Sequence, residues 1–281
     1  MPEVEVTLML RRGFLLFALL FSVWLFAQDS TTKPNLAELY PTLEAKENVL
    51  RNAKVIKSKK LGTGITNPLK LTMQDGQTEF YAVFKDVNVR KAGMTQLKSG
   101  AEMDFKDSWQ FDVAAYELDK MLGLNMVPVT VERKYNGEKG AVQWWIENAM
   151  TEGDRKEKGL EPPDKDAWNR AIFKVRLFDN LIYNIDRNLG NLLITPDWKV
   201  WMIDHSRCFK NLDTLKSQGD LNHFSISMID ALKKLNEAGV KEHCGKYLTI
   251  YEIRSMMKRR DAIVQLFDKM HAEQGDSILT P

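Results

Sequence analysis

The chain has 281 residues and a mass of 32.4 kDa, and its 40 Lys and Arg against 38 Asp and Glu give a net charge of +2. Apolar residues make up 44% and charged residues 28%, which is typical of a globular protein and excludes a disordered, collagen-like or coiled-coil chain. The near-neutral charge argues against nucleic acid as the main partner, because duplex-binding proteins carry a marked basic excess. Two cysteines allow at most one disulfide bond.

The first 27 residues have the plan of a secretory signal peptide. Two arginines precede the uncharged stretch 13–27, and polar residues follow from Gln28. We expect cleavage after Ala27 and an exported mature protein, either periplasmic or secreted. A membrane-spanning helix needs about 20 apolar residues, so no stable span is expected after cleavage. An uncleaved signal anchor is the alternative, because Leu25 is large for its position before the cleavage site.

The next part of the chain is predicted to be mainly β. Residues 28–50 are polar and form an expected lead-in with a short helix. An amphipathic helix is expected over 107–122, where apolar side chains recur at helical spacing before Gly123. The segments with strand composition are 54–61, 69–74, 79–85, 127–131 and 141–147, with a hairpin turn at 75–76.

The second half is predicted to be mainly helical. Thr151–Lys165 is charged and contains proline, so we expect a solvated loop at the boundary between two lobes. Helices are expected over 166–184, 225–237 and 249–272, with one hairpin formed by 191–195 and 199–203. The sequence therefore predicts a two-lobed α+β fold, with a β-rich N-lobe over 51–150, an α-rich C-lobe over 151–281 and a cleft between them.

Three polar residues flank this hairpin. Asp186 lies in the loop after a helix, Asn191 enters the first strand, and Asp204 follows the second strand. Because a hairpin returns the chain to its starting point, the three must lie close together. Two oxygen ligands such as Asn191 and Asp204 suit a hard cation such as Mg²⁺, and Asp186 is left to orient or deprotonate a hydroxyl. The alternative is that Asp186 and Asn191 only cap turns.

The run from Asp186 to Asn191, the hairpin and Asp204 together resemble the catalytic and metal-binding loops of the protein-kinase-like superfamily. The Asp-Arg pair in place of His-Arg-Asp is similar to the atypical members, namely phosphatidylinositol 3-/4-kinases, HipA toxins and Golgi secretory-pathway kinases. Residues 114–131 also resemble the last two groups. The resemblance spans residues 54–272 and implies a kinase-like fold.

The resemblance implies a role for each matching residue. Asp186 matches the catalytic Asp, Asp204 the principal Mg²⁺ ligand and Asn191 the second ligand. Lys85 ends an apolar strand and matches the lysine that holds the α- and β-phosphates of the nucleotide. The partner of that lysine is a helix glutamate, matched best by Asp112, which is one methylene shorter.

The remaining matches concern the nucleotide. Gly62 and Gly64 match the phosphate-covering loop, in which missing side chains let backbone N–H groups approach phosphates. Trp145 and Glu147 match the strand that enters the hinge, where adenine binds. The alternative for the tryptophan pair 144–145 is an ordinary place in the core.

The function implied is phosphoryl transfer from ATP to a hydroxyl of a protein, lipid or sugar, assisted by Mg²⁺ or Mn²⁺. An exported pseudokinase that binds nucleotide or a protein partner without turnover is the alternative, and nucleotidyl transfer is a third. Two further expectations come from the residues alone. Cys208 and Cys244 are either bonded or free, and the charged residues 88–91 form a turn.

Overall fold

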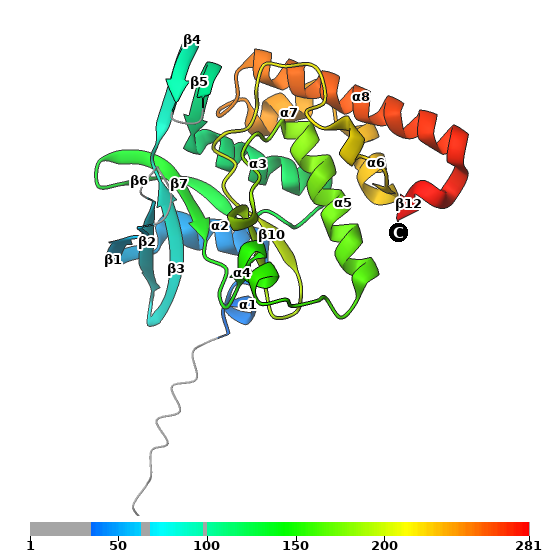
Figure 1. The fold of residues 1–281 in the computed structure, drawn as a ribbon. Coiled ribbons are helices and arrows are strands. Elements are labelled where there is room, and N and C mark those ends of the chain that lie inside the picture. The colour runs from blue at the N-terminus through cyan, green and yellow to red at the C-terminus, as the bar shows by residue number, and fades with distance from the viewer. Residues whose placement is uncertain (1–34, 63–67, 98–99, 281) are drawn as a thin grey trace, which may run out of the picture. The chain divides into compact units, whose positions relative to one another are not determined.

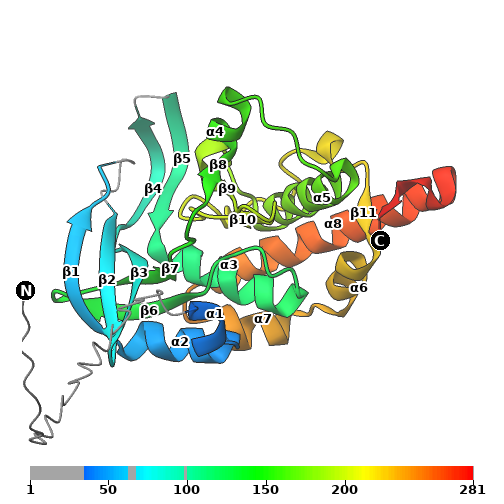
Figure 2. The same ribbon diagram turned by 90° about the horizontal axis from the view of Figure 1, so that it is seen from below.

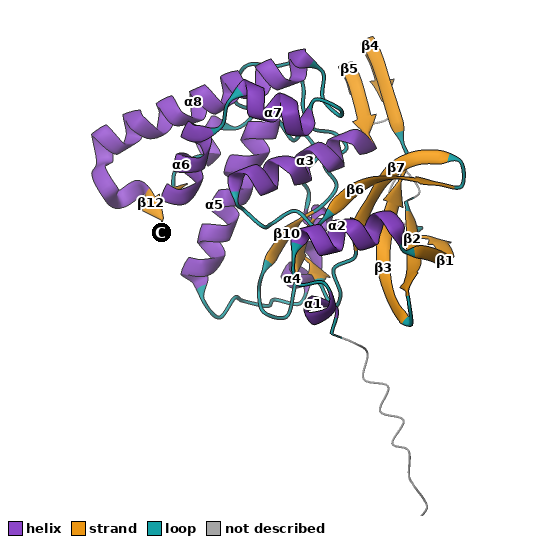
Figure 3. Cartoon of the chain, turned by 180° about the vertical axis from the view of Figure 1, so that it is seen from behind, coloured by secondary structure: helices purple, strands orange, loops and turns teal. Residues whose placement is uncertain are grey.

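Strands and helices are segregated into two lobes in the computed structural model, which describes residues 35–62, 68–97 and 100–280 (Figure 1). From behind, the strands lie on one side and the long helices on the other (Figure 3). Asn35–Pro281 is one compact unit. The predicted signal peptide and Gly64 lie outside the described residues. Within those residues, no helix has the length and apolar run that crossing a membrane would require.

The β-rich lobe is built on an antiparallel five-stranded sheet in the order β1-β2-β3-β7-β6. Along β3, the even-numbered side chains of Phe80–Phe84 are buried, whereas Tyr81, Val83 and Lys85 face the other way. This alternation is expected of a strand with one face in the core. The sequence therefore places Lys85 on the face opposite to the core. The strands are β1 Lys54–Lys60, β2 Leu69–Asp75, β3 Thr78–Lys85, β6 Thr130–Tyr135 and β7 Glu138–Trp144.

Helices α1 (Leu36–Leu39) and α2 (Leu43–Asn52) precede the sheet, and α3 (Trp109–Leu122) packs against β6, β7 and the helical lobe. The hydroxyl of Ser108 accepts a hydrogen bond from the Gln110 N–H at the start of α3. Gly123 ends the helix with a φ of 64°, a conformation that a residue without Cβ adopts readily. The expected helix with its stop at Gly123 is thus confirmed.

A long antiparallel hairpin projects from the β-rich lobe beside α3 (Figures 1 and 2). Its strands are β4 (Asn88–Leu97) and β5 (Gly100–Ser108), so the expected charged turn at 88–91 was wrong. Seven of the ten residues of β4 and four of the nine of β5 are exposed, and only Ser108 is buried. The hairpin therefore lacks the one-sided apolar alternation by which strands are recognised.

The helical lobe contains a small three-stranded sheet of β8 (Met150–Thr151), β9 (Leu192–Ile194) and β10 (Val200–Met202). The hairpin of β9 and β10 confirms the sequence expectation for this segment. Short strands β11 and β12 pair in parallel near the C-terminus. The bounds of the other elements are α4 Glu152–Glu157, α5 Lys165–Ile182, α6 Ile226–Lys234, α7 Glu237–Cys244, α8 Ile250–Gln274, β11 Phe224–Ser225 and β12 Leu279–Thr280, with 3₁₀ turns at Leu189–Asn191, Gln218–Asp220 and Gly275–Ile278.

Three further expectations for the elements were wrong. The segment expected to be a loop after Thr151 begins with α4, because Thr151 and Asp154 form a reciprocal capping box. The helix expected over 225–237 ends at Lys234, and Asn236 caps a separate helix, α7. Strand β6 begins at Thr130 rather than at Val127, whose N–H instead donates to the Asp119 carboxylate.

Both cysteines are free and buried. Burial raises the pKa of each thiol, that of Cys244 to about 12. Of the two alternatives for Cys208 and Cys244, the structure therefore shows free thiols and not a disulfide bond.

Candidate functional site

Lys85 joins the two lobes through carboxylates. Its Nζ lies 3.2 and 3.3 Å from the two carboxylate oxygens of Asp112 on α3, and 3.0 Å from Oδ1 of Asp204 in the helical lobe. Burial alone would lower the pKa of Lys85, but the two carboxylates raise it above its ordinary value, so the side chain is charged. The apolar strand thus ends in a cation held by two acids 92 residues apart in the sequence.

Asp112 holds this position although its side chain is one methylene shorter than that of Glu. The carboxylate is 1% exposed and also accepts a hydrogen bond of 2.9 Å from the backbone N–H of His205. Burial raises its pKa, and the negative charge of Asp204 adds to the rise. Glu117, five residues further along α3, instead pairs with Lys120 at 3.0 Å, as its different helix face predicts.

Gly140 on β7 allows the strands to approach closely beside Lys85. A Cβ at this position would collide with the carbonyl oxygen of Lys85 and with the ring of Phe84. Since Lys85 pairs with Ala141 in the register of β3 and β7, a side chain at 140 would displace the end of β3 that carries the lysine.

Asp186 lies in a loop tied together by three asparagines. Its N–H donates to Asn184 Oδ1 at 3.0 Å, and its carbonyl oxygen accepts hydrogen bonds from the side-chain amides of Asn188 and Asn191. Burial and the charge of Asp204 raise the pKa of Asp186. The carboxylate therefore lies in an acidic environment, which favours acceptance of a proton.

Asn191 and Asp204 are brought together by the backbone of the hairpin. The carbonyl oxygen of Asn191 accepts a hydrogen bond of 3.1 Å from the N–H of Ile203, the residue before Asp204. Asp204 has a φ of 59°, in the left-handed region, where Asp is tolerated better than most residues. Its side chain is 39% exposed, and the adjacent Lys85 lowers its pKa.

The donor set suits a hard cation that also takes phosphate oxygens as ligands. The Asn191 amide nitrogen donates to Asp186, which leaves the amide oxygen for a cation, and Asp204 supplies a partly exposed carboxylate. Among the described residues, no group of three or more His, Cys, Asp and Glu is placed to hold a metal. Mg²⁺ is commonly held by one or two carboxylates together with phosphates, so this limited donor set fits it.

Arg187 organises the loop between these residues. Its guanidinium donates to both oxygens of the Asp179 carboxylate at 2.9 Å and to the carbonyl oxygens of Asn191 and Ile203 at 2.7 and 2.9 Å. It also contacts Nε2 of the buried His205 at 3.1 Å. Because arginine can only donate, Nε2 accepts and the imidazole proton lies on Nδ1. Burial and the charges of Arg187 and Lys85 hold the pKa of His205 well below its usual value, so the ring is neutral.

The nucleotide-binding residues expected from the sequence are placed less uniformly. Trp145 lies on the sheet face opposite to the core, where its ring centroid is 3.8 Å from Nζ of Lys70, whereas Trp144 stacks on Phe80 in the core. Glu147 is exposed beyond the end of β7. Gly62 follows β1 with a φ of 67°, and its partner Gly64 lies outside the described residues.

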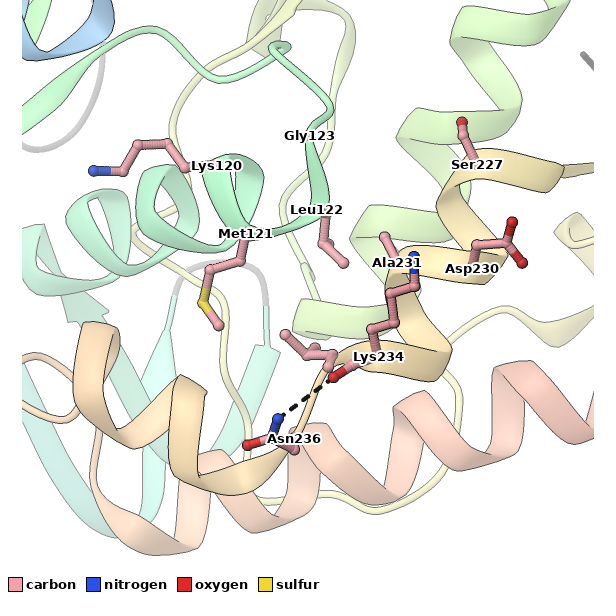
Figure 4. Close-up of a pocket in the computed structure, with 10 residues that line it drawn as sticks. Lys120, Met121, Leu122, Gly123, Ser227, Asp230, Ala231, Lys234 and Asn236 are labelled. Carbon is pink, nitrogen blue, oxygen red and sulfur yellow. Dashed lines mark hydrogen bonds between the residues drawn. The ribbon is translucent and has the colours of Figure 1, made fainter.

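A surface hollow lies elsewhere, at the far end of α3. A cavity of about 550 Å³ opens between the end of α3 and α6, lined by residues that include Lys120, Asp230 and Lys234 (Figure 4). It lies about 15 Å along α3 from Asp112, as the rise of a helix over ten residues requires. The carboxylate cluster around Lys85 is therefore a separate feature of the surface.

Comparison with known proteins relates this geometry to solved structures. No protein-family model and no curated protein matches the sequence. Hydra Fam20, solved with sugar, matches with a TM-score of 0.66 at 14% identity, over 85% of this chain and 92% of that chain. The Golgi casein kinase with Mn/ADP bound matches at 0.58 and 13%, over 83% and 77% of the two chains. The Helicobacter pylori proinflammatory kinase CtkA matches at 0.50 and 10%, over 80% and 98%.

The chain has an atypical protein-kinase-like fold. The expected two-lobed α+β architecture and the expected resemblance to atypical kinases are thereby confirmed. In this kinase-like fold, Lys85 and Asp112 come from the β-rich lobe, and Asp186, Asn191 and Asp204 from the helical lobe.

Sequence reasoning missed two residues that shape the site, Asp179 and His205. Asp179 stands on the apolar face of α5, beside Phe178 and Ile182, and a charge on such a face signals a partner because an unpaired buried charge is costly. That partner is Arg187, which lies beyond the helix end. His205 carries no comparable signal, since its burial depends on the path of the chain after Asp204.

Proposed function

We propose that this protein is an exported kinase that transfers the γ-phosphoryl group of ATP to a hydroxyl with the help of Mg²⁺ or Mn²⁺. The observation that carries the proposal is the cluster in which Lys85 bonds to both Asp112 and Asp204 while Asn191 and Asp186 lie on the adjoining loop. The kinase-like fold supports the reaction class, and the manganese and ADP in the Golgi casein kinase structure support the cofactors.

Each residue has a distinct part in the proposed reaction. Asn191 and Asp204 would hold the metal ion, which when bound neutralises charge on the phosphates. Because Asp204 also bonds to Lys85, a cation held by Asp204 would leave an N–H of Lys85 free for the phosphates of the nucleotide. Asp112 keeps Lys85 in place during this exchange.

Asp186 orients the acceptor and takes its proton. The acceptor oxygen forms a bond to the γ-phosphorus, the bond from that phosphorus to the bridging oxygen breaks, and ADP leaves with the electron pair. The hydroxyl proton passes to Asp186, whose raised pKa suits the task. Sugar in the hydra Fam20 structure makes sugar hydroxyls the first acceptors to test, followed by those of proteins and lipids.

The export signal supports a location outside the cytoplasm, and it also favours a second candidate. Residues 1–27 carry the features of a signal peptide. Nucleotide is scarce outside a cytoplasm, which favours a pseudokinase that binds nucleotide through the same residues without turnover. The complete set of Asp186, Asn191 and Asp204 favours turnover.

A thermal-shift titration tests the proposal. The mature chain, residues 28–281, is titrated with ATP with and without Mg²⁺ or Mn²⁺, beside Asp204→Ala. We expect a metal-dependent stabilisation that reaches about 3 kcal/mol at a hundredfold excess over the dissociation constant. The variant should lose it. A wild-type protein that nucleotide and metal fail to stabilise would exclude both the kinase and the nucleotide-binding pseudokinase.

A further inference from the structure

The cations around the site differ in how many hydrogen-bond donors they have left. Lys85 has three N–H donors and makes three hydrogen bonds to the carboxylates of Asp112 and Asp204. Arg187 has five donors and makes five contacts, with Asp179, Asn191, Ile203 and His205. Arg187 is therefore committed to the loop and cannot bind a substrate.

Arg207 is different. It follows Asp204 by three residues, and its guanidinium forms one ion pair, from NH2 to Glu102 on β5. Among the described residues it makes no other hydrogen bond, and its Nε is buried without a partner. Besides the buried Nε, three N–H donors on the two terminal nitrogens are thus unused, on the segment that also carries Asp204.

The hairpin of β4 and β5 fixes the direction of Arg207. The guanidinium carbon lies 4.5 Å from the centroid of the Phe105 ring, and the Glu102 carboxylate binds its end. The backbone is fixed as well, because the Ser108 N–H donates to the carbonyl oxygen of Ser206 at 2.9 Å. A side chain that is 19% exposed and held from two sides is preorganised for a ligand.

Arg207 also lies within electrostatic reach of the proposed proton acceptor. Burial and Asp204 raise the pKa of Asp186, and the charge of Arg207 opposes this rise. Together with its place three residues after Asp204, this puts the cation beside the carboxylates that the proposed reaction uses.

We propose that Arg207 binds the γ-phosphoryl group and stabilises the charge on its oxygens during transfer. The inference rests on the proposed kinase function and adds a cation with free donors to the residues of that reaction. A guanidinium fork matches two phosphoryl oxygens, and such a contact strengthens as charge builds up in the transition state. Arg207 forms and breaks no covalent bond during the transfer, and it neither takes nor gives a proton.

The alternative is that Arg207 only ties the hairpin to the loop through Glu102. Lys210 provides the matched control, because its Nζ binds the other oxygen of the same Glu102 carboxylate and also the carbonyl oxygen of Asp104. Removing either cation loosens the same tie. Lys210 is 8% exposed and has one N–H donor left, whereas Arg207 is 19% exposed and has three left besides its buried Nε.

The test compares ATP and ADP binding by calorimetry with Mn²⁺ present, in wild type, Arg207→Gln, Arg207→Lys and Lys210→Gln. We expect Arg207→Gln to bind ADP within twofold of wild type but ATP about tenfold more weakly, with a kcat lower by about a hundredfold or more. Arg207→Lys keeps the ion pair with Glu102, so it is expected to fold and to lose kcat by a smaller factor. Lys210→Gln should keep the wild-type ratio of ATP to ADP affinity.

Three results would overturn the assignment. Equal loss of ATP and ADP binding in Arg207→Gln and Lys210→Gln would show that Arg207 only links the hairpin to the loop through Glu102. An unchanged ATP to ADP ratio with a raised KM for the acceptor would assign Arg207 to the acceptor. An Arg207→Lys variant with wild-type kcat and ATP binding would also exclude the role. If the wild-type protein binds neither ATP nor ADP, the proposed kinase function is wrong and this inference fails with it. The wild-type titration alone distinguishes this outcome from a failure of the role given to Arg207.

Discussion

Replacing Asp112 by Asn removes one charge from the cluster and leaves its shape unchanged. The amide oxygen can still accept the hydrogen bond from the His205 N–H, which is 2.9 Å long in the native protein. The same oxygen still accepts from Lys85 at 3.2 Å but is now neutral, the contact of 3.3 Å to the second oxygen is lost, and Asp204 remains the charged partner of Lys85. The substitution therefore isolates the charge pair between the strand and α3.

The expected cost follows from the burial of the pair. The Asp112 side chain is 1% exposed and that of Lys85 is 13% exposed, and removing one partner of a buried ion pair typically costs about 3–5 kcal/mol. Because Asp204 remains beside Lys85, we expect a loss of about 2–3 kcal/mol in the free energy of unfolding. For a chain of this size, that loss lowers Tm by roughly 5–10 °C. Urea denaturation followed by circular dichroism measures the loss directly.

Glu117→Gln on the same helix is the control. The side chain of its partner Lys120 is 27% exposed and also pairs with Glu47 at 2.7 Å, so Lys120 keeps a carboxylate partner and we expect a cost of about 1 kcal/mol or less. We expect Asp112→Asn to lose its metal-dependent nucleotide binding as well, and Glu117→Gln to retain it. An Asp112→Asn protein as stable as Glu117→Gln would refute the reasoning that Lys85 depends on the shorter acid.

Further predictions concern groups outside the cluster. Burial raises the pKa of Asp119 to about 6 from 3.8, so the stability that its proton contributes is present below about pH 4 and is lost as the pH rises through 6. Between pH 4 and 7, the free energy of unfolding of the wild type, measured in urea, should fall by about 2.5 kcal/mol relative to that of Asp119→Asn. Parallel pH profiles of the two proteins would contradict this. Although burial opposes it, hydrogen bonds from Lys120, Arg51 and Tyr116 lower the pKa of Glu47, so Glu47→Gln should cost about 1–2 kcal/mol at pH 7 and less below about pH 4, checked by the same method. Cys208 and Cys244 are expected to resist labelling by a maleimide in the folded protein, and both are expected to react in urea without reductant. Mass spectrometry that finds no added label after unfolding would instead reveal a disulfide bond.

The catalytic loop region was predictable because its geometry is local. Asp186, Asn191 and Asp204 lie within 19 positions, and a hairpin between two of them forces them together in any fold. The β-rich core was predictable for a similar reason, since strands such as β3 alternate buried and open side chains. In both cases, short-range pattern and tertiary placement agree.

The hairpin and α4 were missed because their stability comes from other parts of the structure. The exposed strands β4 and β5 are held at their base by ion pairs of Arg90 and Lys106 with the buried Glu252 of α8, more than 140 positions away. The capping box of α4 lies within a charged segment that resembles a loop in composition. Long-range charge pairs and single caps leave little periodic signal in a sequence.

The partner of Lys85 shows the limit of reasoning by residue type. A helix glutamate was expected there, and Asp112 matched it imperfectly. The structure places the shorter side chain within 3.2 Å of the lysine, a separation that depends on how α3 packs against β7 and not on the residue itself. Arg207 was missed for the same reason, because its unused donors become visible only when the partners of its neighbours are known.

Phosphoryl transfer itself is the most direct test of the central claim. The mature protein is incubated with γ-labelled ATP, Mn²⁺ and an extract of the cell envelope, beside Asp186→Asn, which should still bind nucleotide because it retains Lys85, Asn191 and Asp204. The account predicts label on an acceptor with the wild-type protein and none with the variant. Wild-type protein that binds ATP and metal but transfers no label, or a variant that transfers label as well as wild type, would contradict the role given to Asp186.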